Sequence, residues 1–303
     1  MGPLATMSRS AKRNLWGYLF LLPALVFLVV VFAYPIIETF RISLYNWRLL
    51  APSRPFVGLD NYRNLLNDTR FLKSLANTFL YTMGVVPMEL LFGFCLALVL
   101  NRKDVPFTEQ FTTVYFLPVV TSMVAVSFVW RWLYEPSFGL INYVLGNLGL
   151  PEPRWLMDPS TALISIMITS VWKSMGNSMV IFLAGLRNIP REFYEAAQID
   201  GANRTQMMRF ITLPLINSTL VFLTITSVIS SFQVFSQVVV MTTQYYEAGG
   251  PLDSTRVLVY HIYEVAFKAL KMGEAAAAAY VLFAIILLAT VLQLKFTQRK
   301  VEY

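Results

Sequence analysis

Long apolar runs separated by short polar segments make up most of this chain. About six of them reach the length of about 20 residues that a helix needs to cross about 30 Å of hydrocarbon. Because lipid offers no partners to backbone polar groups, such runs form helices that satisfy those groups internally. We therefore predict an all-α polytopic membrane protein with about six transmembrane helices, at residues 16–37, 75–100, 111–130, 162–186, 211–242 and 275–294.

Two longer polar segments interrupt this pattern, at residues 44–70 and 135–159. Proline and glycine recur in both, for example Pro52, Pro55 and Gly58 in the first, and these residues end helices and favour turns. We predict that both segments lie outside the membrane, with one short amphipathic helix near residues 62–66.

The composition fits a lipid environment. Hydrophobic residues make up 56% of the chain and charged residues 14%, and the mean hydropathy is +0.58, which is unusual for a soluble domain. The net charge of +7 comes without a dense block of Lys and Arg, so no nucleic-acid partner is expected. The single cysteine, Cys95, lies in an apolar run and cannot form a disulfide framework or a thiolate metal site within this chain.

Basic residues indicate the orientation. Arg102, Arg187, Arg191, Arg204 and Arg209 fall in connections that lie in the cytoplasm if the N-terminus is cytoplasmic. Their density there is about twice that of the opposite side, which agrees with the positive-inside rule. We predict that both termini are cytoplasmic and that the apolar run at residues 15–33 is an uncleaved first helix.

The sequence lacks the patterns of several kinds of catalytic site. No phosphate-binding G-x-x-x-x-G-K-[ST] loop and no G-x-S-x-G nucleophile motif is present. One histidine, His261, cannot form a histidine-based metal site. We expect no catalytic residues, no metal and no enzymatic activity in this chain.

The polar connection at residues 188–214 predicts two short helices joined by a turn. Asn188 is a candidate N-cap of the first helix, Pro190 suits its first turn, and Asp200-Gly201 ends it. Asn203 is placed to start the second helix, and Pro214 marks the return to the membrane. Three- and four-residue spacing puts four residues on one face of the first helix, where small side chains allow close packing: Phe193, Ala196, Ala197 and Asp200.

This connection resembles the EAA signature of binding-protein-dependent ABC importer permeases. The matching residues are Glu195-Ala196-Ala197, Gly201 after three residues, and Ile211-x-Leu213-Pro214 after a further nine, with no gap in the spacing. Residues 57–62, 115–118, 184–190 and 249–251 are also similar to the carbohydrate branch of that family, the relatives of maltose, multiple-sugar and glycerol-phosphate permeases. The link at residues 243–249 is longer than is usual there.

The resemblance implies one transmembrane domain over residues 1–303, of the type I ABC importer kind, with a cytoplasmic coupling loop at 187–214. That loop would dock on an ATPase through Glu195, Ala196, Ala197, Asp200, Gly201 and Ala202. The implied partners are a second homologous permease subunit, an ATPase dimer and an external solute-binding protein. ATP and Mg would bind to the ATPase, so no cofactor is expected on this chain, which would lie in a bacterial or archaeal cytoplasmic membrane.

Two charged residues, Glu89 and Lys173, fall near the middle of predicted spans. A charge there costs about 3 kcal/mol or more unless it faces protein or water. Either the two residues line a translocation path or pair with each other, or each is a structural tether to neighbouring polar groups.

Sugar contacts, by the same resemblance, would come from the spans on both sides of the coupling loop. Hydroxyl, amide and aromatic side chains that suit a polyol occur there: Ser170, Trp172, Lys173, Ser174, Asn177, Ser227, Ser230, Ser231 and Gln233, to which Glu89 is added. Serine also allows close helix packing, which is the competing interpretation.

The sequence as a whole predicts a permease subunit that imports a sugar or sugar-like solute by alternating access driven by a separate ATPase. The alternatives are the same architecture with an amino acid or phosphate as solute, or a secondary transporter driven by an ion gradient. The sequence shows no obvious internal inverted repeat with paired broken helices, a feature of many secondary transporters, so it does not favour that alternative.

Overall fold

The structure is a computed structural model in which residues 9–102, 104–243, 246 and 249–297 are described. Within these ranges it is helical and contains no strand, only isolated bridges such as Tyr45 with Phe56. The predicted all-α class is confirmed. The ends of the chain, whose cytoplasmic location the sequence predicts, and positions 244–245 and 247–248 of the long link lie outside the described residues.

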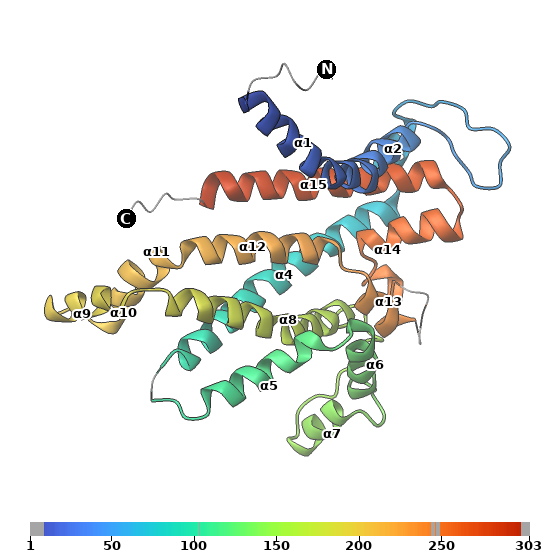
Figure 1. Ribbon diagram of the computed structural model, residues 1–303. Coiled ribbons are helices and arrows are strands. Elements are labelled where there is room, and N and C mark those ends of the chain that lie inside the picture. Colours follow the sequence, from blue (N-terminus) through green and yellow to red (C-terminus); the bar gives the residue numbers. More distant parts are fainter. Residues whose placement is uncertain (1–8, 103, 244–245, 247–248, 298–303) are drawn as a thin grey trace.

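The N-terminal span consists of α1 (Arg9–Leu28), a π-helical turn η1 (Val29–Ala33) and α2 (Tyr34–Ser43). Its most apolar window, within residues 17–43, is not buried by the rest of the chain, as expected of a helix that faces lipid or another subunit. Only α2 packs closely on the chain, along the C-terminal helix α15 (Met272–Thr297), where the rings of Phe40 and Tyr280 lie 4.9 Å apart (Figure 1).

The first polar segment contains the predicted short helix, as α3 (Asp60–Asn67). The buried Asn61 side chain donates to the carbonyl oxygens of Ser43 at 2.7 Å and Tyr45 at 3.0 Å, which ties this helix to the end of α2. The next helix, α4 (Thr69–Leu100), begins at Asp68, whose side chain accepts a hydrogen bond from the Arg70 N–H. Such a cap satisfies a backbone donor that the first helical turn leaves free.

Two long helices form the centre of the fold, α4 and α8 (Ala162–Arg187), and they share the most extensive helix contact in the chain. Buried residues of both helices contribute to two of the three apolar clusters, for example Tyr81 with Ile166 and Ala97 with Met179. The third cluster joins α4 to the last two spans.

The third predicted span is not one straight helix. α5 (Thr108–Val120) and α6 (Met123–Leu133) meet at an angle of 99°. Pro118 lies in the last turn of α5, and Thr121 and Ser122 have extended backbones between the helices. The following polar segment carries α7 (Leu140–Asn147). The prediction of one continuous helix at 111–130 was therefore wrong, because the structure has two helices with a sharp bend between them.

The fifth predicted span is also broken. After α9 (Arg191–Ile199) and α10 (Arg204–Met207), the chain passes through η2 (Met208–Thr212) and α11 (Leu213–Leu215) and bends by 65° into α12 (Asn217–Phe232). α12 ends near polar Ser230, Ser231 and Gln233, and a separate helix α13 (Ser236–Thr242) follows. The predicted helix at 211–242 thus joined elements that the structure separates, because apolar composition alone does not show a break.

The last part of the described chain contains η3 (Pro251–Asp253), α14 (Leu258–Tyr263), η4 (Glu264–Lys268) and α15. In total, four described helices are long and apolar enough to span a membrane, and six spans result if each bent pair counts as one. The predicted number is confirmed in this sense. Helices α9 and α10 project from one end of the molecule, and α6, α7 and α13 lie toward the other (Figure 1).

Candidate functional site

The connection between α8 and α12 contains the two short helices that the sequence predicts. α9 ends in a Schellman motif, in which Ala202 N–H donates to Ala197 O at 2.8 Å and Gly201 N–H donates to Gln198 O at 3.1 Å. Gly201 has a φ of +80°, and a Cβ added there would meet nothing within 4 Å. The backbone conformation, rather than a lack of space, therefore requires glycine at this turn.

The second helix starts with a capping box. The Asn203 side chain accepts from the Gln206 N–H at 2.9 Å, and the Gln206 side chain accepts from the Asn203 N–H at 2.8 Å. The predicted start at Asn203 is confirmed. The predicted N-cap at Asn188 was wrong, because Asn188 ends α8 and α9 begins only after Pro190. Proline disfavours a helical conformation at the preceding residue, Ile189, which favours a helix that starts after Pro190 rather than at Asn188.

The outer surface of α9 is apolar as well as charged. Tyr194 points back into the protein, where its hydroxyl lies 3.0 Å from Thr212 Oγ1. Phe193 is 44% exposed and Ile199 is 87% exposed, although both are large apolar side chains outside the spans. The predicted face is exposed at Phe193, Ala196 and Asp200 and partly buried at Ala197. Sequence reasoning missed Ile199, which lies just before the turn.

The two charged residues within the spans have separate partners. Lys173 Nζ donates to the carbonyl oxygens of Pro118 at 3.0 Å, Val119 at 3.3 Å and Thr121 at 2.9 Å. These carbonyls belong to the break after α5, where no further helical turn supplies N–H donors. A cation at the C-terminal end of a helix also interacts favourably with the helix dipole.

Glu89 joins three helices. It is buried on α4, and its Oε1 accepts from Ser178 Oγ of α8 at 2.7 Å and from Ser227 Oγ of α12 at 3.1 Å. Among the described residues, no ion pair connects Glu89 to Lys173. The interpretation of these two residues as partners was therefore wrong, and each tethers neighbouring polar groups.

The predicted sugar-contact residues divide by accessibility. Ser170, Ser227 and Ser231 are buried, as is Glu89. Lys173 and Ser174 are partly buried, and the exposed members are Trp172, Asn177, Ser230 and Gln233. The structure thus places three of the five serines inside the helix packing, and the exposed members are the most accessible to a solute.

Ser170 belongs to a polar group that the sequence did not indicate. Gln237 Nε2 donates to Tyr81 Oη at 3.0 Å and lies 3.5 Å from Ser170 Oγ, which connects α13, α4 and α8. Tyr81 is 2% exposed. The sequence gave no signal of this polar partner, because it comes from α13, a distant part of the chain.

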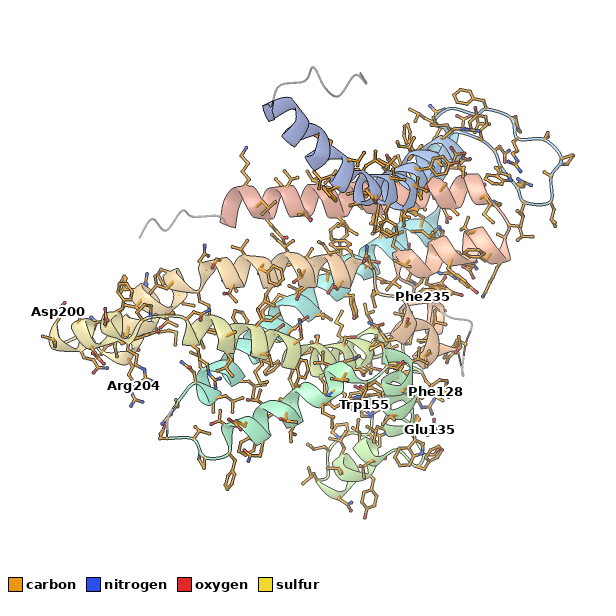
Figure 2. All side chains as sticks on the ribbon, in the orientation of Figure 1. Phe128, Glu135, Trp155, Asp200, Arg204 and Phe235 are labelled. Carbon is orange, nitrogen blue, oxygen red and sulfur yellow. The ribbon has the colours of Figure 1, made fainter. Side chains whose placement is uncertain are left out.

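A row of aromatic rings extends from Trp172. Its ring lies 5.5 Å from that of Trp130, which lies 5.3 Å from Tyr134, which in turn lies 5.2 Å from Trp155. Trp155 and Phe235 lie far from Asp200 and Arg204, which flank the turn between α9 and α10 (Figure 2). Trp172 also lines an apolar hollow of about 660 Å³ between α4, α5 and α8.

A compact ionic cluster lies near α14. Arg256 is 2% exposed and donates to Asp253 Oδ1 at 2.8 Å and to Glu264. His261 is buried beside it, and within the described part of the chain its ring nitrogens have no hydrogen-bond partner. Burial lowers the pKa of His261, against the raising effect of Asp68, whose carboxylate oxygen lies 3.9 Å from Nε2. Burial therefore favours the neutral form of this histidine.

No group of three or more His, Cys, Asp and Glu side chains able to hold a metal occurs within the described ranges. The expectations of no metal and no cofactor on this chain stay predictions.

Comparison with known proteins covers nearly the whole chain. Residues 67–302 match the model of a family described as binding-protein-dependent transport system inner membrane component. The chain is 37% identical over 282 residues to the Probable ABC transporter permease protein YurN of Bacillus subtilis, covering 92% of this chain and 94% of that protein. It is 35% identical to the Lactose transport system permease protein LacF of Rhizobium radiobacter, covering 95% of this chain and 96% of the relative.

A solved structure has the same fold. A chain of the bacterial alginate ABC transporter in complex with alginate pentasaccharide-bound periplasmic protein superposes with a TM-score of 0.83, covering 96% of each chain at 23% identity.

Proposed function

The chain belongs to the binding-protein-dependent transport system inner membrane components, and on this basis we propose that it is the permease subunit of an ABC importer for a sugar or sugar-like solute. The names of its relatives support the solute class, since one is a lactose permease and another serves arabinooligosaccharides. Alginate, the solute of the transporter with the same fold, is also a carbohydrate. Residues 1–303 act as a single transmembrane domain in this proposal.

One observation carries the proposal: the pair of short helices α9 and α10, which projects beyond the spans and has large apolar side chains exposed at its end. Exposed apolar residues beside a rigid turn suit a docking surface for another protein. We assign this segment, 187–214, to docking on a cytoplasmic ATPase pair. The residues that carry the coupling are Glu195, Ala196, Ala197, Asp200, Gly201 and Ala202.

The Schellman motif and the capping box make the segment rigid, because each satisfies backbone groups at a helix end. A rigid segment between α8 and α12 can transmit a displacement of the ATPase to both helices. ATP hydrolysis and Mg binding take place on that partner, and this chain is the non-catalytic transport subunit, with both termini in the cytoplasm.

The exposed polar and aromatic residues of α8 and of the end of α12 form the solute path in this proposal. Trp172 offers an aromatic face for a sugar ring, and Asn177, Ser230 and Gln233 offer amide and hydroxyl groups. A second permease subunit would complete the path. An external solute-binding protein delivers the solute, as the family description and the alginate complex suggest.

Uptake in proteoliposomes tests this function. The chain would be reconstituted with its second permease and ATPase, with the binding protein added outside, and uptake of radiolabelled oligosaccharides would be measured. We expect uptake that requires ATP and the binding protein and is stopped by vanadate. Uptake of only an amino acid or phosphate would contradict the solute class, and uptake driven by an ion gradient without ATP would contradict the importer assignment.

A further inference from the structure

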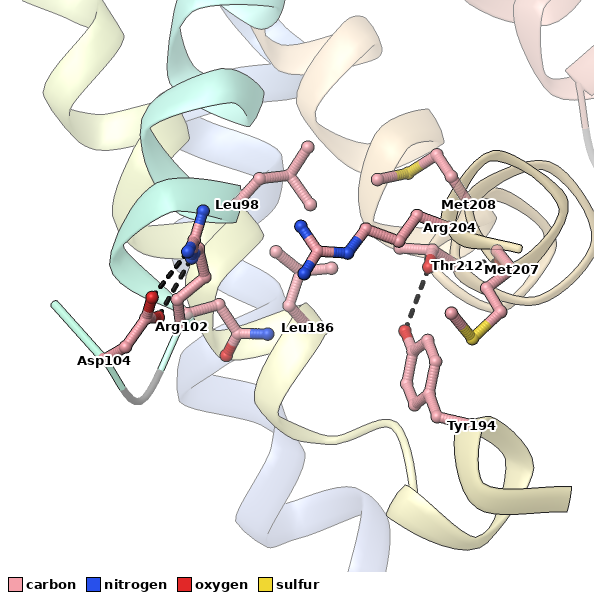
Figure 3. A pocket seen from close by; sticks show the side chains of 10 residues that line it. Leu98, Arg102, Asp104, Leu186, Tyr194, Arg204, Met207, Met208 and Thr212 are labelled. Carbon is pink, nitrogen blue, oxygen red and sulfur yellow. Dashed lines mark hydrogen bonds and ion pairs between the residues drawn. The ribbon is translucent and has the colours of Figure 1, made fainter. Parts of the chain in front are cut away.

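A cleft lies at the end of the spans from which α9 and α10 project, between the ends of α4 and α8 and these two short helices. Its first section has a volume of about 550 Å³, and an adjoining section of about 620 Å³ shares four lining residues with it: Asn101, Arg102, Leu186 and Tyr194. The hydrogen bond between the hydroxyls of Tyr194 and Thr212 lies at one side of the first section (Figure 3).

The described lining of this cleft is basic. Arg102 and Arg204 line the first section, and Arg187 and Arg191 line the second. Two carboxylates, Asp104 in the first section and Glu195 in the second, leave the described lining with a net charge of +2. A site with excess positive charge and several guanidinium groups favours an anion, and arginine suits phosphate oxygens because its donors form a planar fork.

The two arginines of the first section differ in whether they already have a side-chain partner. Arg102 Nε donates to Asp104 Oδ1 at 3.0 Å, and the two groups form an ion pair. Arg204 makes no side-chain hydrogen bond or ion pair within the residues that the structure describes, although its guanidinium points into the cleft between Arg102 and the Tyr194–Thr212 bond (Figure 3). Its donors are therefore free for a ligand.

The position of Arg204 is fixed by the fold. It is the first residue of α10, directly after Asn203 of the capping box and close to the Gly201 turn. The same section also has apolar walls, formed by Leu98, Leu186, Met207 and Met208. A basic centre with apolar walls at the end of the spans matches a lipid, which joins a charged headgroup to hydrocarbon chains at that depth.

We propose that this cleft binds the phosphate headgroup of an anionic phospholipid, with Arg204 as its principal contact and the hydrocarbon against Leu98 and Met208. The site lies beside the segment proposed to dock on the ATPase, but its existence does not depend on the solute or on ATPase docking. A free phosphate ion has the same headgroup chemistry, but it would leave the apolar walls without a partner.

Native mass spectrometry of the purified full-length chain tests the site. The chain would be released from nanodiscs that contain phosphatidylcholine with or without phosphatidylglycerol, and bound lipids would be counted. We expect retained phosphatidylglycerol on the wild type and about fivefold weaker binding in Arg204→Gln, the loss expected for one basic contact at a membrane surface. Arg209→Gln is the matched control, because Arg209 is exposed on the same segment but does not line either section of the cleft.

Three results would overturn the proposal. Equal losses in both variants would indicate surface charge without a site, and unchanged binding in Arg204→Gln would remove its principal contact. Thermal stabilisation of the wild type by inorganic phosphate, without an effect of phosphatidylglycerol, would assign the cleft to a free anion. Both variants should unfold at the wild-type temperature in phosphatidylcholine alone, which separates lost binding from misfolding.

Discussion

The ammonium nitrogen of Lys173 lies 3.0 Å from the carbonyl oxygen of Pro118, at the sharp bend between α5 and α6. Two further carbonyl oxygens of the same bend, those of Val119 and Thr121, accept from this nitrogen. A lysine that a hydropathy plot marks as an anomaly within α8 thus stabilises the broken end of another helix.

Replacing Lys173 by Met should destabilise the protein, because three carbonyl oxygens at the bend lose their donor. The cost of leaving such groups without a partner is about 1 to 3 kcal/mol. Thermal unfolding in detergent measures it. Asn177→Leu, one turn further on α8 at an exposed position, is the control and should unfold near the wild-type temperature. Equal midpoints for Lys173→Met and the wild type would contradict this role.

The protein should remain more stable when Glu89 is replaced by glutamine than when it is replaced by leucine. Glu89→Gln keeps an oxygen that can accept from Ser178 and Ser227, whereas Glu89→Leu leaves both hydroxyls without this acceptor. We expect Glu89→Leu to unfold more easily than Glu89→Gln by about 1 to 2 kcal/mol. The measurement is the midpoint of denaturation of the two variants.

The same residue allows a test against pairing with Lys173. Since the two side chains share no partner, the effects of Glu89→Gln and Lys173→Met should add in the double variant. Recovery of stability in the double variant would restore the pairing hypothesis.

Gly176 permits the close approach of α5 and α8. A Cβ at this position would lie 2.1 Å from the Tyr115 carbonyl oxygen, a backbone atom that cannot move alone. Gly176→Ala should therefore cost about 3 kcal/mol or more. The matched control is Gly84→Ala, whose Cβ would lie 2.9 Å from the flexible side chain of Met167. This substitution should lower the free energy of unfolding by less than about 1.5 kcal/mol. Similar yields and melting temperatures for both variants would refute the packing assigned to Gly176.

His261 should make the protein sensitive to acid. Burial lowers its pKa in the folded protein from the ordinary value of 6.5, while Asp68 and Glu264 oppose this effect and Arg256 and Arg70 add to it. As the pH falls through 6.5, the unfolded chain binds a proton more readily than the folded one, so the free energy of unfolding falls. Thermal unfolding at several pH values between about 7.5 and 5 measures this change.

The variant His261→Leu removes the titrating group and should lose less stability over the same pH range. The ring makes no hydrogen bond within the described chain, so leucine removes no such contact at neutral pH. A parallel decline of the variant and the wild type would show that another group causes the acid sensitivity.

The sequence predicted the features that depend on local pattern. Four spans appear as long helices because their apolar runs exceed the length needed, and Gly201 adopts the positive φ that the turn requires. The capping role of Asn203 also depends only on nearby residues. These features need no information about which helices are neighbours.

The errors arose where distant residues decide the conformation. The bend after Pro118 is supported by Lys173 of another helix, and the partners of Glu89 come from α8 and α12. An apolar run looks continuous whether or not such a partner exists. For the same reason the sequence could not separate exposed Asn177 and Gln233 from buried Ser227 and Ser231 as solute contacts.

The central claim is that the α9–Gly201–α10 segment couples this permease to an ATPase, and Gly201→Val tests it most directly. Valine is strained at a φ of +80° and should distort the turn. Gly149→Val is the matched control, because Gly149 also has a positive φ, +68°, and open space around its Cβ, but lies in the connection between α7 and α8.

ATP hydrolysis by the complete reconstituted transporter, stimulated by the solute-loaded binding protein, is the measurement. The account predicts that Gly201→Val inserts normally but loses this stimulation, while Gly149→Val retains it. Normal stimulated hydrolysis in Gly201→Val would contradict the assignment of this segment as the coupling element.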